Sequence, residues 1–205
     1  MTPGALLGRW LARHLAGEQS AWVEACADRL RSEGSERDLY LSVSQVSRRV
    51  GKEPLRLTAD ELQAAATSRP GWDPSDWTVD QAARIYLLLA STSSGAELGR
   101  RLDRLCGAAD IGELVAFYRG LPLYPDQARH ALRAAEGVRS NMRVVFEAIA
   151  HRNPYAAEQF EPTAWNQMVL KALFVGSRLD LIVGLDRRRN AHLARMLCDY
   201  AHERW

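Results

Sequence analysis

The length and composition place the chain among ordinary globular proteins. Its 205 residues are 47% hydrophobic and 25% charged, which excludes a disordered or fibrous chain and predicts a single domain over residues 1–205. The net charge is only +2 and the arginines are scattered among acids at helical spacing, so we expect no nucleic-acid partner.

Apolar residues at three- and four-residue steps predict helices from the start of the chain. The first begins at Pro3 and ends before Gly17. Charged residues interrupt its apolar side and no cleavage site follows, so it is not expected to be a signal peptide. A second helix is predicted over residues 20–32, with Gly34 as a left-handed cap.

The third predicted helix stops at Gly51 and carries a regular apolar stripe of Leu39, Val43, Val46 and Val50. The alternation of Leu39, Leu41 and Val43 would also fit a strand. We favour a helix, because the longer period continues to Val50 and the sequence offers no convincing partner strand.

A capping box at Thr58 to Glu61 predicts the start of a short helix. Residues 68–77 contain two prolines and a glycine, which predicts a loop. Its tryptophans, Trp72 and Trp77, either pack onto the body of the protein or form an exposed recognition surface, and packing is favoured.

A second capping box, Thr78 to Gln81, begins a helix that is predicted to be central and buried because it contains Ile85, Leu87, Leu88 and Leu89. Further helices are predicted at residues 96–106, 110–118, 126–136, 140–150, 163–176 and 190–204. A short apolar turn is expected at residues 179–183. Roughly a dozen helices and no convincing strand predict an all-α fold of stacked antiparallel helix pairs, either an irregular α-solenoid or a bundle.

The common catalytic and cofactor motifs are missing from the sequence. It has no phosphate-binding loop, no dinucleotide-binding glycine pattern, no nucleophile elbow and no HExxH pair. Cys26, Cys106 and Cys198 lie far apart without metal-ligand spacing, so reduced, partly buried thiols are expected. We therefore assign no catalytic residue, cofactor or metal. No segment reaches the roughly 20 apolar residues of a membrane span, and we expect a cytoplasmic protein.

The helix that begins near Thr163 carries polar residues among apolar ones. Gln167 and Lys171 share one of its sides, flanked by Phe174. If this side is covered, the ammonium requires an acid, for which Asp186 or Asp199 are the candidates, and the lysine could act as a base or a nucleophile. Alternatively, the lysine extends from the edge of the helix into water, which is the favoured interpretation.

Other polar residues near the carboxyl terminus also have two interpretations. Asn166 either caps a neighbouring helix or holds a ligand, and capping is the commoner use. Residues 151–155 end one helix and fix a turn, because Pro154 restricts the residue before it. The run of arginines at residues 187–189 either faces solvent or attracts a phosphate at the start of the last helix.

The runs VRSNMRVVFEAIAHRNPYAAEQF, AWNQMVLKALFVG and GLDRRRNAHLARMLCDYAHERW closely resemble the carboxyl-terminal signature of EboA-type proteins. They cover about a third of the chain, residues 138–205, whereas the amino-terminal helices resemble that family only in length and helical character. The resemblance implies a gene cluster whose other products look like a prenyltransferase, a metal-dependent hydrolase and a sugar-isomerase-like barrel. It implies a role in moving secondary-metabolite precursors towards the periplasm and supplies no catalytic residues.

The leading hypothesis is a non-catalytic helical adaptor that binds a small amphipathic metabolite, or a partner protein of the gene cluster, during metabolite traffic. The alternatives are an enzyme that uses Lys171 with an acid or histidine, and a pure interaction module with an exposed apolar patch around Trp72 and Trp77. The candidate ligand-binding residues are Asn141, His151, Trp165, Asn166, Gln167, Lys171, Asp186 and His202.

Overall fold

A computed structural model describes residues 1–204; Trp205, the last residue of the predicted domain and of the carboxyl-terminal signature, lies outside the described residues. The described part contains α-helices, two short 3-10 helices and two isolated β-bridges, and no strand. The α-helices are α1 (Pro3–His14), α2 (Gly17–Glu33), α3 (Glu36–Val50), α4 (Ala59–Ser68), α5 (Val79–Ala90), α6 (Gly95–Ala108), α7 (Ile111–Arg119), α8 (Ala131–Arg139), α9 (Arg143–Ala150), α10 (Tyr155–Gln159), α11 (Pro162–Phe174) and α12 (Ala191–Arg204). The 3-10 helices are η1 (Leu121–Leu123) and η2 (Gln127–His130).

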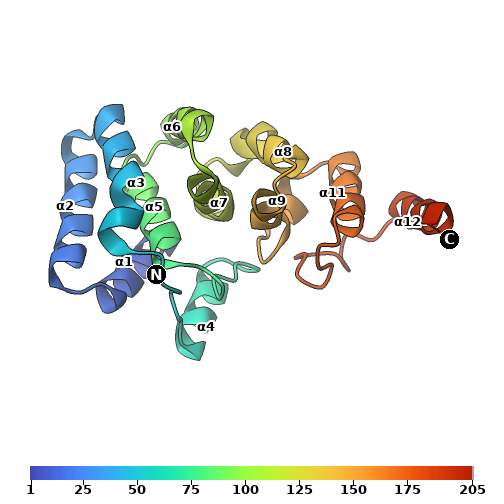
Figure 1. Cartoon of the computed structure of the whole chain (residues 1–205), viewed down its shortest axis with the longest axis horizontal. Helices are drawn as coiled ribbons and strands as arrows, with labels where there is room; N and C mark the ends of the chain where they lie inside the picture. The colour runs from blue at the N-terminus through green and yellow to red at the C-terminus, as the bar shows by residue number, and fades with distance from the viewer. Residues whose placement is uncertain (205) are drawn as a thin grey trace.

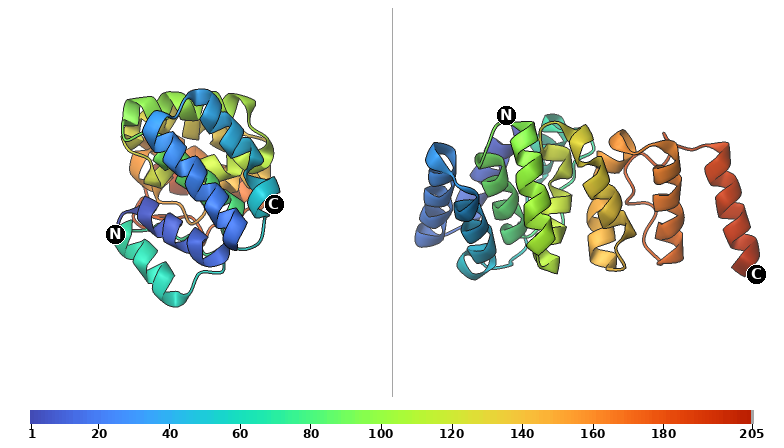
Figure 2. Two further views of the ribbon diagram at one scale, coloured as in Figure 1. Left: turned by 90° about the vertical axis from the view of Figure 1, so that its left-hand side faces the viewer. Right: turned by 90° about the horizontal axis from the view of Figure 1, so that it is seen from above.

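The helices stand side by side in a row along the long axis of the molecule, from α2 at one end to α12 at the other (Figures 1 and 2). Consecutive helices pack in pairs, such as α2 with α3 and α8 with α9, and α5 lies among α1, α2, α3 and α7. The predicted all-α fold of stacked helix pairs is therefore confirmed. The single-domain organisation stays a prediction, although the buried apolar side chains form one connected cluster from Leu6 to Leu193.

Most of the predicted helix ends are confirmed by their contacts. The capping boxes of Thr58 with Glu61 and of Asp110 with Glu113 are both formed, and each satisfies amide groups that the helix itself leaves without partners. Gly51 ends α3 with a φ of 79°, a backbone conformation that favours glycine. The α3 segment is helical throughout, so the strand alternative is wrong.

One predicted cap conformation and two predicted helix starts are wrong for local reasons. Gly34 has a φ of −56° and is no left-handed cap; the space there is small, since an added Cβ would lie 2.5 Å from the carbonyl oxygen of Leu30. The helix expected at residues 126–136 begins as η2, where Nε2 of His130 lies 3.0 Å from the carbonyl oxygen of Pro125. The helix expected from Ser140 begins at Arg143, because the Ser140 hydroxyl accepts from the Met142 amide and forms a turn instead.

The tryptophans of the loop between α4 and α5 are packed inside the protein. Trp72 and Trp77 are 2% and 3% exposed. The Trp72 ring lies 5.6 Å from that of Trp10 on α1 and 5.7 Å from that of Trp77. The loop thus covers α1, and the alternative of an exposed interaction patch around these tryptophans is wrong.

The central helix α5 is buried as predicted, but it also contains an ion pair that the sequence pattern does not indicate. Ile85, Leu87 and Leu88 are fully buried. Arg84 donates to Asp80 at 2.6 Å and to the Ser47 hydroxyl at 2.6 Å, and both charged side chains are almost inaccessible to water. The pair joins α5 to α3 through the hydroxyl of Ser47.

None of the described helices is both long enough and apolar enough to cross a bilayer.

Gly137 allows α8 to approach α9 closely. An added Cβ would lie 2.4 Å from Ile149 of α9 and 2.7 Å from the ring of Tyr118 of α7. These distances are too short for a methyl group, so the helix spacing at this point requires glycine. This spacing also sets the position of the carboxyl end of α8 relative to α9.

The substitution Gly137→Ala is expected to lower the free energy of unfolding by about 1–3 kcal/mol, because it overpacks the contact of α8 with α9 and α7. Gly107 is the control, since an added Cβ there meets nothing within 4 Å. Gly107→Ala should be neutral or stabilising, by up to about 1 kcal/mol. Urea denaturation measures both; equal effects would contradict the close approach.

Candidate functional site

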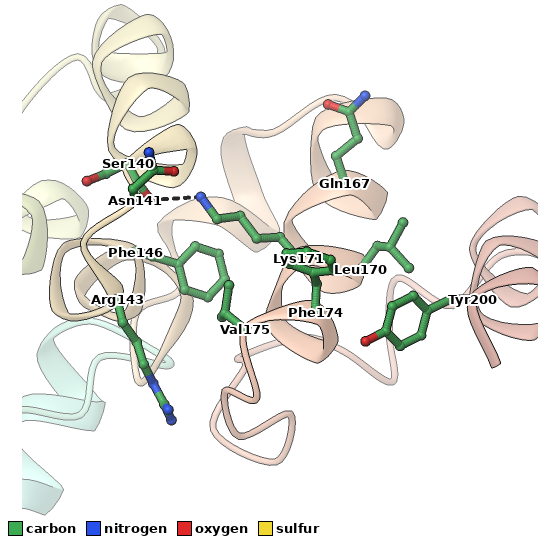
Figure 3. Close-up of a pocket in the computed structure, with 10 residues that line it drawn as sticks. All are labelled: Ser140, Asn141, Arg143, Phe146, Gln167, Leu170, Lys171, Phe174, Val175 and Tyr200. Carbon is green, nitrogen blue, oxygen red and sulfur yellow. Dashed lines mark hydrogen bonds between the residues drawn. The ribbon is translucent and has the colours of Figure 1, made fainter. Parts of the chain in front are cut away.

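A cavity of about 490 Å³ lies between α9, α11 and α12 (Figure 3). It is bounded by the connection between α8 and α9, one side of α11, and Tyr200 of α12. The lining residues are Ser140, Asn141, Arg143, Phe146, Gln167, Leu170, Lys171, Phe174, Val175 and Tyr200. We call this cavity the α11 groove.

The walls of the α11 groove are largely apolar. Phe146 is fully buried beneath it, whereas Phe174 is 65% exposed and belongs to the few large apolar side chains that face solvent. A second cavity, of about 300 Å³, lies on the α8 side and shares Gln167 and Lys171 with the groove. The spacing of Gln167, Lys171 and Phe174 along the helix places them at the same cavity, as expected.

Lys171 binds the end of a neighbouring helix rather than an acid. Its ammonium group donates to the carbonyl oxygens of Val138 at 2.5 Å and Ser140 at 2.8 Å, at the carboxyl end of α8, where helix carbonyl groups lack partners and cations are favoured. Its Nζ also lies 5.3 Å from the centre of the Phe146 ring. Burial lowers the pKa of Lys171. The ammonium group is thus bound to backbone and does not extend into water, so the favoured interpretation is wrong. The alternative of an acid partner is also wrong, because Asp186 and Asp199 are exposed and the acceptors are carbonyl oxygens.

Asn166 lies in the core and holds a capping residue. It is 1% exposed and exchanges two amide hydrogen bonds with Asn190, of 3.1 and 2.9 Å. Asn190 in turn accepts from the amide of Leu193 in the first turn of α12. Asn166 thus positions the residue that caps α12, but it caps no helix end itself, and its contacts attach α12 to α11.

Trp165 is also inside the core. It contacts Arg188, one of the arginines that are predicted to face solvent or a phosphate. The side chain of Trp165 is fully buried. The guanidinium group of Arg188 lies 4.9 Å from its ring centre and donates to the carbonyl oxygens of Ala156, Ala157 and Phe160. Arg188 therefore caps the end of α10, while Arg187 and Arg189 are exposed.

His151 directly follows α9 and does not line the α11 groove. Its Nε2 is 3.0 Å from the hydroxyl of Ser177, which donates to Glu147 at 2.8 Å. His151 and Glu147 line a separate cavity of about 350 Å³, together with residues of α5, α7 and the loop before α5. Desolvation lowers the pKa of His151, which the nearby Glu147 partly offsets.

The structure therefore brings together three of the eight candidate residues, Asn141, Gln167 and Lys171. Trp165 and Asn166 are buried, and Asp186 and His202 are exposed and do not line the α11 groove. The apolar residues Phe146, Leu170 and Val175 are site residues that sequence reasoning missed. Helical spacing could have found Leu170, which precedes Phe174 by one turn on α11.

One protein-family model matches the chain, over residues 4–205, and its description is "Metabolite traffic protein EboA". No curated protein and no solved structure matches the chain. The match reaches from α1 to α12, so it includes the amino-terminal helices as well as the carboxyl-terminal signature.

Asn166→Ala is expected to lower the free energy of unfolding by about 1 kcal/mol or more, because it removes both hydrogen bonds between Asn166 and Asn190. It should also speed amide hydrogen exchange in α12 more than elsewhere, which hydrogen-exchange mass spectrometry measures. The neighbouring Gln167→Ala changes an exposed amide on the same helix and should stay within about 0.5 kcal/mol. An unchanged rate of amide hydrogen exchange in α12 would show that Asn166 does not attach α12 to α11.

Acidification is expected to destabilise the protein partly through His151. Its pKa is lower in the folded protein than the ordinary 6.5, so the unfolded chain binds this proton more readily. Stability should therefore fall as the pH drops through about 6.5 towards the folded pKa. His151→Gln should reduce this pH dependence, and His192→Gln on the exposed side of α12 should not. The measurement is the thermal unfolding temperature from about pH 5 to about pH 8, the range in which histidine changes its charge.

Proposed function

Since the chain belongs to the EboA family of metabolite traffic proteins, we propose that it is a non-catalytic helical protein that binds a small amphipathic metabolite in the α11 groove. The observation that carries the proposal is the groove itself, a cavity with apolar walls and a few polar side chains between three helices.

The size and composition of the α11 groove support a small-molecule ligand. Its volume of about 490 Å³ falls within the range of roughly 300–1,000 Å³ that is usual for such sites. Leu170, Phe174 and Val175 offer an apolar surface, while Asn141 and Gln167 offer amide groups at the edge. An amphipathic molecule would bury its apolar part and keep its polar part hydrogen-bonded.

The contacts of Lys171 favour binding over catalysis. Proton transfer would require a partner acid or histidine near the amine, whereas the hydrogen bonds of Lys171 are with two backbone carbonyl oxygens. These contacts hold the ammonium in one place at the edge of the groove. In this role the lysine positions a ligand and ties α11 to α8.

The proposal includes the process that the family implies. The protein would take up a precursor of a secondary metabolite in the cytoplasm and pass it to other proteins of its gene cluster. The single most informative experiment is to purify the protein from its own host and identify the bound small molecules by native mass spectrometry.

Leu170→Trp is expected to fill the α11 groove and remove the bound metabolite from the purified protein, with a loss of at least about tenfold in occupancy. Leu132→Trp on α8 is the matched control, because Leu132 is 83% exposed and does not line the groove. Circular dichroism should show both variants folded. A molecule that stays bound to the Leu170→Trp protein would place the site elsewhere.

A further inference from the structure

The charged residues that line the α11 groove and its smaller neighbour are all cationic. They are Arg143 and Lys171 in the groove, and Arg139 with Lys171 in the cavity on the α8 side. Neither cavity is lined by an aspartate or a glutamate. An arginine-rich chain does not explain this, because the cavity beside His151 is lined by Asp76 and Glu147 as well as Arg119.

Lys171 lacks a carboxylate counter-ion among residues 1–204. Its hydrogen-bond acceptors are two neutral carbonyl groups, and the third neighbour of its ammonium is the ring of Phe146. By contrast, Arg143 lies 2.7 Å from the carboxylate of Glu147. An ammonium has three N–H donors, so one donor of Lys171 is left for a bound molecule, at the boundary of the two cavities.

Arg139 adds a second cation without a partner on the other side of Lys171. It is the last residue of α8, and its exposed side chain forms no hydrogen bond or ion pair with the part of the chain that the structure describes. A negatively charged group beside Lys171 would also be attracted by Arg139, which lines the adjoining cavity together with Lys171.

We infer that the ligand of the α11 groove is an anionic amphiphile, one molecule with a phosphate or carboxylate head group at Lys171 and a hydrocarbon part against Leu170, Phe174 and Val175. Figure 3 shows the side chain of Lys171 extending from α11 towards Ser140, whereas Leu170 points towards Tyr200. This inference rests on the proposed function and adds the sign and position of the ligand's charge.

The test compares three ligands that share one alkyl chain and differ in head-group charge: dodecyl phosphate, dodecyl maltoside and dodecyltrimethylammonium. Each is titrated below its micelle concentration against the full-length protein loaded with the neutral fluorescent probe N-phenyl-1-naphthylamine. Displacement of the probe reports occupancy of the groove whatever the charge of the competitor. Dodecyl phosphate should bind at least about tenfold more tightly than the maltoside, and the trimethylammonium compound most weakly.

The variants test which residues create the preference. Arg139→Gln and Lys171→Met should each reduce the ratio of phosphate to maltoside affinity by about threefold or more, and leave the maltoside affinity nearly unchanged. Lys171→Met also removes a cap from α8. If the Lys171→Met variant fails to fold, Arg139→Gln still tests the inference. Arg48→Gln, an equal loss of charge at an exposed position of α3, should leave the ratio as it is.

Several results would overturn the inference. Equal affinity for the three head groups would show that the groove does not select an anion, while the proposed binding function would stand. Failure of every ligand to displace the probe would reject the inference together with that function. Binding to vesicles of phosphatidylglycerol without any response to monomeric dodecyl phosphate would assign the cations to a membrane surface instead.

Discussion

Carbonyl groups at the ends of short helices need hydrogen-bond donors. In the carboxyl-terminal half of the chain, the side chains that supply these donors join the helices to one another. A row of helices has many such ends, and leaving them unsatisfied away from water is costly. Asn153, which is buried, donates from its side-chain amide to the carbonyl oxygens of Tyr118 and Ala148 near the ends of α7 and α9. Arg188 serves α10 and Lys171 serves α8 in the same way. The carboxyl ends of α7, α8 and α10 are therefore each bound by a side chain from another part of the row.

The α11 groove follows from the way in which one of these contacts is made. Lysine is long, so α11 can bind the end of α8 without packing directly against it, and the side chain crosses the space between them (Figure 3). The close approach of α8 to α9 at Gly137 fixes the other side of that space. A structural cation thus becomes part of the lining of a cavity. The same residue serves stability and is available to a ligand.

The sequence was sufficient for features that depend on local chemistry. Capping boxes such as Thr58 with Glu61, the glycine that ends α3, and the spacing of Gln167 and Lys171 on one side of α11 are all encoded within a few residues. Contacts with backbone atoms of distant segments could not be predicted in this way. Every residue has a backbone carbonyl oxygen, so the type of a residue does not show which carbonyl oxygen will accept a hydrogen bond. Nothing in the sequence therefore indicates that Lys171 binds Val138 and Ser140, or that Arg188 caps α10. For this reason neither interpretation of Lys171, extension into water or pairing with an acid, includes these contacts.

The attachment of α12 couples the groove to the end of the chain. This helix packs mainly against α11 and is fastened at its start by the paired amides of Asn166 and Asn190, yet it contributes Tyr200 to the cavity wall. A molecule that touches both α9 and α12 adds a bridge between elements that are otherwise connected through α11. A docking protein that restrains the last helix would therefore also change the affinity of the groove for such a molecule, by thermodynamic reciprocity.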